Sequence, residues 1–280
     1  MRRLDIPSIA GKEKEIYIEC ANDFARKKEY TKVALAYAEE VDKCSREYVT
    51  YVPYNIVGLP HISINDEEKE IINKVYDQKF ANENSIGRKY YNIIMANAKG
   101  RCPICGGGKL KNLDHFLPKS RYPLLCVTPI NLVPTCRDCN MEKGAEVGND
   151  YYEIPFHPYL ETMGDKWIEC DLNFYSDKTF SIKFINGYEE SLNPDLWRKY
   201  QAHMRINDLD STFCSRAEEE LENVRVIYKN VLSACGKEEL KSLLVEMKKS
   251  VETIDVNSWK AALYRALITK CDEFCEWLAL

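Results

Sequence analysis

The 280-residue chain has no apolar run that approaches the roughly eighteen residues of a membrane-spanning helix. Its first residues, Met1 to Asp5, lack the apolar stretch of a secretory signal peptide. The chain also has no internal repeat and no low-complexity segment. These absences predict a cytoplasmic protein that does not act at a membrane.

Cysteine, by contrast, is plentiful, with twelve residues. Without an export signal, a chain of this length favours metal ligation and buried thiols over disulfides. Four cysteines form two Cys-x2-Cys pairs, and eight others have no assignment. Each pair can point two sulfurs at one ion, and two pairs supply the tetrahedral four-thiolate set that zinc accepts. We therefore predict a structural Zn²⁺ site at Cys102, Cys105, Cys136 and Cys139.

The charge of the chain is unevenly distributed. The net charge is −5, in a composition that is 45% hydrophobic and 30% charged, as is ordinary for a globular protein. Residues 88–144 hold ten Lys or Arg against three Asp or Glu, a balance of +7, so the remainder carries −12. Such a basic island can attract a polyanion locally. The alternative is an unevenly charged, solvated surface.

Hydrophobic periodicity predicts helices on both sides of this island. Apolar residues recur at three-to-four spacing over residues 12–49, and further helices are expected from Asn65 or Asp66 and over residues 85–98. The residues from 193 onward are again mainly helical. Two alternating segments around residues 167–184 enclose a polar turn and predict a hairpin.

Within the island, the pattern predicts two strands followed by a helix. The first strand ends near His115, a second lies within residues 123–133, and the helix starts at Cys136. The expected fold is mainly α (α+β), with a small ββα unit and a zinc ribbon between two helical regions. The predicted regions are residues 1–99, 100–160 and 161–280.

Asp114 and His115 are adjacent at the expected end of the first strand. Neighbouring strand residues face opposite sides, so the two side chains can have separate tasks. Asp114 could bind a divalent cation and His115 could act as a general base, while Asn140 could add a neutral oxygen ligand. One carboxylate, one amide and several waters suit Mg²⁺. A cation beside a phosphate and a base beside water are the requirements of phosphodiester hydrolysis.

Several segments of the island carry a family resemblance. Their order is Cys-x2-Cys, Leu113-Asp114-His115-Phe116-x-Pro118-Lys119-Ser120, Asn131-Leu132-Val133 and Cys136-x2-Cys139-Asn140-x2-Lys143-Gly144. Over roughly residues 102–144 the chain resembles the HNH endonucleases of the His-Me finger (ββα-metal) superfamily.

The resemblance implies a role for each matching residue. His115 would be the general base, Asp114 and Asn140 would bind a catalytic Mg²⁺ or Mn²⁺, and Asn131 would brace the loop that carries the base. The four cysteines would bind the structural zinc and take no part in catalysis. The last position of the motif is often histidine, so the asparagine here leaves the choice of metal open.

Lys119, Arg121 and Lys143 are candidate phosphate contacts, although each is equally typical of a solvated surface. The His-Phe-x-Pro-Lys-Ser-x-Tyr-Pro wording also resembles, more weakly, nuclease subunits of Septu-like anti-phage systems, which act with an ATPase partner. We therefore expect the acidic flanks to limit access to DNA or to dock a partner. Two alternatives stay open, a zinc-ribbon adaptor without catalysis and a nuclease directed at RNA.

Overall fold

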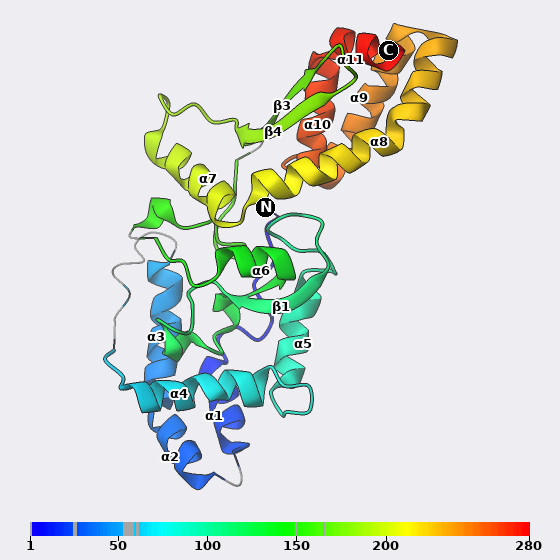
Figure 1. The fold of residues 1–280 in the computed structure, drawn as a ribbon. Helices are drawn as coiled ribbons and strands as arrows, with labels where there is room; N and C mark the ends of the chain where they lie inside the picture. The colour runs from blue at the N-terminus through cyan, green and yellow to red at the C-terminus, as the bar shows by residue number, and fades with distance from the viewer. Residues whose placement is uncertain (1, 25–26, 53–58, 60–61, 149, 165) are drawn as a thin grey trace. The chain divides into compact units, whose positions relative to one another are not determined.

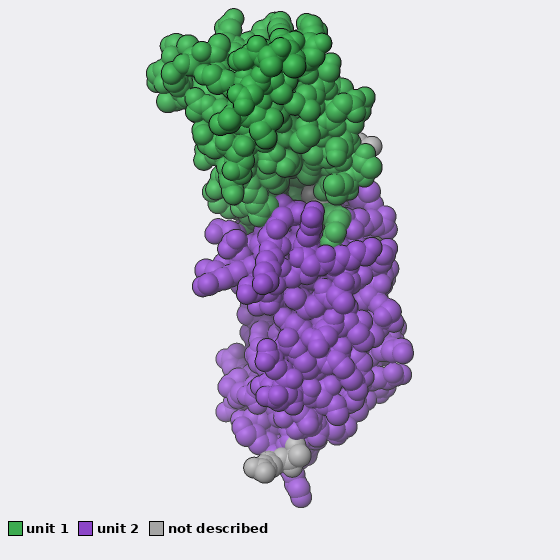
Figure 2. Space-filling model, turned by 90° about the vertical axis from the view of Figure 1, so that its right-hand side faces the viewer, with its two compact units in different colours: residues 1–2, 163–280 green, residues 3–162 purple. Residues whose placement is uncertain are grey.

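The computed structural model describes residues 2–24, 27–52, 59, 62–148, 150–164 and 166–280 (Figure 1). The chain divides into two compact units, one of residues 3–162 and one of residues 1–2 with 163–280 (Figure 2). Each unit combines helices with a two-stranded antiparallel sheet. This confirms the predicted mainly α (α+β) class.

The first unit begins with helices, as the periodicity predicted. They are α1 (Glu13–Asn22), α2 (Lys28–Ala36), α3 (Ala38–Tyr51), α4 (Asp66–Lys74), the π-helical turn η2 (Val75–Phe80) and α5 (Arg88–Asn97). Asn65 caps α4, because its side chain accepts a hydrogen bond from the Glu68 amide at 2.9 Å. The π-helical continuation of α4 was not expected from the sequence.

A hairpin and a helix follow in the predicted order, but the second strand, expected within residues 123–133, begins at Leu132 and extends to Cys136. β1 (Leu110–His115) pairs antiparallel with β2 (Leu132–Cys136), and α6 (Arg137–Lys143) begins directly after β2. His115 lies opposite Leu132 at the end of the pairing. The connection between the strands contains two short helical turns, η3 (Pro123–Leu125) and η4 (Pro129–Asn131), and a further turn, η5 (Tyr151–Glu153), follows α6.

One hydrophobic core joins these two parts of the first unit. Buried side chains from the N-terminal helices, such as Tyr17 and Ile72, belong to the same cluster as Leu113 of β1 and Val127 of the connection. Burial of a continuous apolar surface is the main stabilising term of a fold. The helices before the hairpin therefore help to fix the position of β1.

The second unit contains the predicted hairpin and helices. β3 (Ile168–Phe174) pairs with β4 (Phe180–Asn186), and the helices are α7 (Pro194–Ile206), α8 (Leu209–Cys235), α9 (Lys237–Ile254), α10 (Trp259–Thr269) and α11 (Cys271–Ala279). Arg265 of α10 donates to the backbone oxygen of Ile168 at 3.0 Å, which ties α10 to the hairpin. Among the described residues, no helix has the length and apolar character needed to cross a membrane.

Candidate functional site

The four cysteines of the two Cys-x2-Cys pairs come together as predicted. All four are buried, and their sulfur atoms lie within 4.8 Å of one another. Zinc bound tetrahedrally at about 2.3 Å separates its sulfur ligands by about 3.8 Å. The Sγ atoms of Cys105 and Cys136 are 3.8 Å apart. This cluster can therefore hold a metal ion such as zinc.

Glycine allows the backbone to approach these sulfurs. Gly106 has a φ of +73°, in the left-handed region that favours glycine. At Gly108, an added Cβ would lie 2.7 Å from the sulfur of Cys136, so a side chain there would displace the cluster. Cys136 ends β2 and also caps α6, where its sulfur accepts from the Cys139 amide at 3.5 Å. The cluster thus links the hairpin to the helix.

His115, the last residue of β1, is held in one orientation. Its Nε2 lies 2.9 Å from the backbone oxygen of Cys126. Because a carbonyl oxygen only accepts, Nε2 carries the proton and Nδ1 carries the lone pair. The ring of Tyr76 packs edge-on against the imidazole, with centroids 4.4 Å apart.

Burial lowers the pKa of His115 to about 3, because the charged imidazolium would lose its hydration; the hydrogen bond to Cys126 opposes this shift. The imidazole is therefore neutral at neutral pH. A neutral imidazole with a lone pair on Nδ1 can accept a proton from water.

Asp114 is also buried, at 8% exposure, and it bonds to Lys143. The ammonium of Lys143 lies 3.1 Å from Asp114 Oδ2 and donates to the backbone oxygen of His115 at 2.8 Å. Burial raises the pKa of Asp114 to about 6, and the charge of Lys143 opposes that shift. Lys143 is only 4% exposed, and the contacts described for its ammonium are to the Asp114 carboxylate and the backbone oxygen of His115. Its role as a phosphate contact stays a prediction.

Asn131 ties down the segment that follows His115. Its Oδ1 accepts from the Leu117 amide at 2.8 Å, and its Nδ2 donates to the backbone oxygens of Leu117 and Leu125 at 3.1 and 3.2 Å. Asn131 is fully buried, so these bonds do not compete with water. The contacts are those of a brace, while their importance for catalysis stays a prediction.

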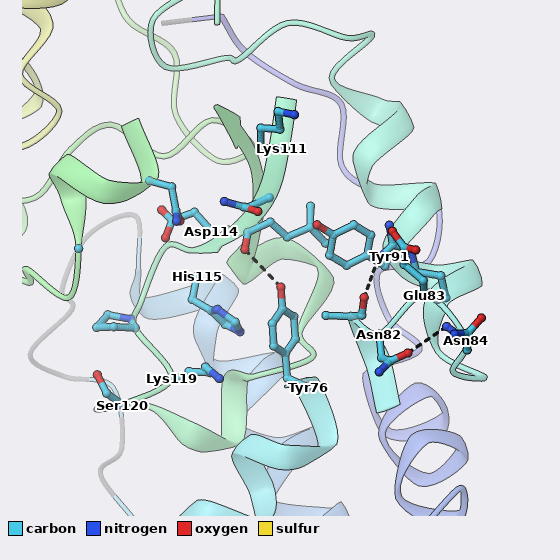
Figure 3. Close-up of a pocket in the computed structure, with 17 residues that line it drawn as sticks. Tyr76, Asn82, Glu83, Asn84, Tyr91, Lys111, Asp114, His115, Lys119 and Ser120 are labelled. Carbon is cyan, nitrogen blue, oxygen red and sulfur yellow. Dashed lines mark hydrogen bonds between the residues drawn. The ribbon is translucent and has the colours of Figure 1, made fainter. Parts of the chain in front are cut away.

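A pocket of about 840 Å³ brings Asp114, His115 and Asn140 to one surface (Figure 3). Lys119 also lines it, and its ammonium bonds to both carboxylate oxygens of Asp77 at 2.5 Å. Arg121 is exposed and lies outside this lining. Lys143 does not line the pocket either. Of the three candidate phosphate contacts, Lys119 is thus the one in the pocket wall.

The pocket has a second wall that the sequence did not indicate. It is formed by residues of η2, of the connection after η2 and of α5, including Tyr76, Asn82, Arg88 and Tyr91. These residues lie at least nineteen positions before β1, and no motif spacing connects them to it. The one available signal was weak, since the basic island begins at Arg88.

Comparison with known proteins places this chain in a family. No family model matches the chain, and no solved structure matches it. Protein ea31 of Escherichia phage lambda is 31% identical over 223 residues, which cover 72% of this chain and 73% of ea31. The chain belongs to the ea31 family.

A second relative connects this ea31-family chain to a bacterial protein. The Septu protein PtuB of Bacillus thuringiensis is 31% identical over 94 residues. The match covers 30% of this chain and 37% of PtuB, so little more than a third of PtuB is represented. This is a distant similarity over part of each chain.

Proposed function

We propose that this ea31-family chain is a metal-dependent HNH-type endonuclease that hydrolyses phosphodiester bonds of DNA. One observation carries the proposal: a neutral, oriented imidazole shares a pocket with a carboxylate and an amide. Those are the groups that hydrolysis of a phosphodiester requires from a protein.

In this proposal His115 accepts a proton from water at Nδ1. The Cys126 carbonyl keeps the other nitrogen protonated and stabilises the imidazolium that forms. Asn131 and the Tyr76 ring hold the imidazole and the following segment in place, so that little motion is needed during the reaction.

The donor set also fits a hard divalent cation. Asp114 and Asn140 would hold Mg²⁺ or Mn²⁺, with waters completing the coordination in the open part of the pocket. When bound, the ion would neutralise charge that develops on the phosphate oxygens. Lys143 forms an ion pair with the same carboxylate, and its positive charge favours the ionised form of Asp114. The four cysteines would hold a structural Zn²⁺ that fixes the junction of β2 and α6.

The partial match to a Septu protein supports a further element of the proposal, a role in anti-phage defence. We propose that the nuclease acts with an ATPase partner, encoded by a neighbouring gene. Purification of the chain alone and together with that gene product tests this. Strong, unregulated cleavage by the chain alone would overturn the dependence on a partner.

The nuclease itself is tested by incubation of supercoiled plasmid with the parent, His115→Ala and Asn140→Ala proteins in Mg²⁺ or Mn²⁺, with the partner present. Loss of a positioned general base should slow cleavage by at least about 100-fold. Met141→Ala is the matched control, because Met141 follows Asn140 on α6, is 62% exposed and lies outside the pocket lining. Its cleavage rate should equal that of the parent.

Equal cleavage by the parent and His115→Ala would show that His115 is not the base. Binding of DNA without any cleavage by the folded, zinc-loaded parent would favour the adaptor alternative. A parallel reaction with RNA distinguishes a nuclease directed at RNA, since the chemistry at His115 does not depend on the sugar.

A further inference from the structure

The candidate reacting groups are largely buried, and this restricts what can reach them. Asp114 and His115 are 8% and 9% exposed, and the wall formed by Asn82, Arg88 and Tyr91 lines the same pocket. Duplex DNA is stiff, with a persistence length of about 150 base pairs, and it holds each nucleotide in its stack. An unpaired nucleotide can leave the stack and enter a protein pocket, as it does in enzymes that act on bases.

Two lysines lie on either side of the reacting groups. Figure 3 shows Lys111 at one end of the pocket and Lys119 toward the other, with Asp114 and His115 between them. Lys111 precedes Asp114 by three residues on β1, a distance of about 10 Å along a strand. A phosphodiester backbone that followed β1 would therefore meet a cation on each side of the reacting groups.

The two lysines differ in how far their charge is already neutralised. Lys119 is paired with Asp77. Lys111 is exposed, and its ammonium has no hydrogen bond or ion pair with any residue of the described ranges. An unneutralised cation at the edge of a polar pocket suits an anionic ligand.

The opposite wall carries groups that suit a base. The guanidinium of Arg88 stacks on the ring of Tyr91 at 4.2 Å, and it donates to the Ala81 backbone oxygen and to Asn92. These contacts fix a flat cation, which is a surface on which nucleobases stack. The exposed amides of Asn82 and Asn84 on this wall can bond to base edges.

We propose that this pocket holds an unpaired nucleotide, with its backbone along β1 and its base against the wall of Asn82, Asn84 and Arg88. The substrate is then a single strand or a locally unpaired stretch of nucleic acid. This inference rests on the proposed function and specifies the substrate of the same pocket.

Binding can be tested without cleavage by use of the His115→Ala protein and fluorescence anisotropy. The probes are a 20-nucleotide single strand, the matching duplex, and that duplex with a central unpaired bubble. The single strand and the bubble should bind at least ten times more tightly than the duplex. Equal affinity for all three would overturn the inference.

Side-chain replacements locate the binding to the pocket. In the His115→Ala protein, the additional replacement Lys111→Gln or Arg88→Gln should weaken single-strand binding at least five-fold. The matched controls are Lys109→Gln and Lys89→Gln, since both lysines are exposed, lie within two residues of Lys111 and Arg88 respectively, and are outside the lining. They should change the affinity less than two-fold, and equal losses in the controls would overturn the assignment.

Cleavage of the same three probes by the parent in Mn²⁺, with the partner protein present, separates the two proposals. Cleavage of the duplex as fast as the bubble would overturn the unpaired-nucleotide inference and leave the nuclease standing. Absence of cleavage together with the ten-fold binding preference would overturn the proposed nuclease and support the nucleotide pocket.

Discussion

Replacement of Asn131 by alanine tests whether one buried amide supports the segment that carries the candidate base. The amide makes three hydrogen bonds, all to backbone groups, at 2.8, 3.1 and 3.2 Å. Alanine would remove every one of them and leave the Leu117 amide and two carbonyl oxygens without these partners. Because the site is fully buried, water cannot easily replace the lost bonds.

The expected cost follows from the number of bonds. A buried hydrogen bond contributes about 1 kcal/mol net, so the loss of three should lower the free energy of unfolding by about 3 kcal/mol. For a unit of this size, that corresponds to a fall of roughly 9 °C in melting temperature. If the free energy of local opening around Leu117 falls by the same amount, hydrogen exchange at the Leu117 amide should become about 100-fold faster.

Thermal unfolding and amide hydrogen exchange, both in saturating zinc, measure these effects. The matched control is Asn92→Ala, since Asn92 is exposed on α5 and accepts one bond from Arg88. It should change the free energy of unfolding by less than about 0.5 kcal/mol. If Asn131→Ala melts like the control and its Leu117 amide exchanges at the parent rate, Asn131 does not brace this segment.

Three further perturbations address other parts of the site. Gly108→Ala should speed the loss of zinc to a chelator at least ten-fold, because its Cβ would lie 2.7 Å from the sulfur of Cys136; a zinc-sensitive dye measures the rate. Burial lowers the pKa of His115 from 6.5 to about 3, so its contribution to stability is complete above pH 6.5 and declines as the pH falls toward 3. Between pH 7 and 4.5, the free energy of unfolding of His115→Gln should therefore fall by roughly 2–3 kcal/mol less than that of the parent, as measured by urea unfolding with chelator. Equal losses would contradict this. Lys143→Met should destabilise the first unit by about 3 kcal/mol, since it leaves the Asp114 carboxylate buried without its cation. The double variant with Asp114→Asn should recover part of that loss, and additive losses would show that the pair is not coupled.

Features that depend on nearby residues could be predicted from the sequence. The cysteine cluster follows from two Cys-x2-Cys turns, each of which fixes its own pair of sulfurs. The helix at Asp66 follows from its cap at Asn65 and the acidic residues of its first turn. The strand that ends at His115 follows from the proline shortly after it. In each case the physical cause lies within a few residues of the feature.

Features that depend on tertiary packing could not be predicted in the same way. Lys143, near the end of a short helix, is of a residue type that is rarely buried, and only the fold brings its ammonium to Asp114. The wall of Asn82, Arg88 and Tyr91 belongs to a region that the sequence indicated simply as helical. Its position opposite β1 is set by the shared hydrophobic core, which no local pattern describes.

The helices before the hairpin also complete the hydrogen bonding of β1. Leu113 lies opposite Pro134, which has no backbone N–H to donate. The Leu113 carbonyl instead accepts a hydrogen bond from the Tyr76 hydroxyl at 3.3 Å. The same tyrosine packs its ring against His115. One side chain from the N-terminal helices therefore supports both the strand and the candidate base. The cysteine cluster lies at the far end of the hairpin, whereas the end that carries His115 is supported by those helices. The ββα segment and the helical region therefore form a single structural unit.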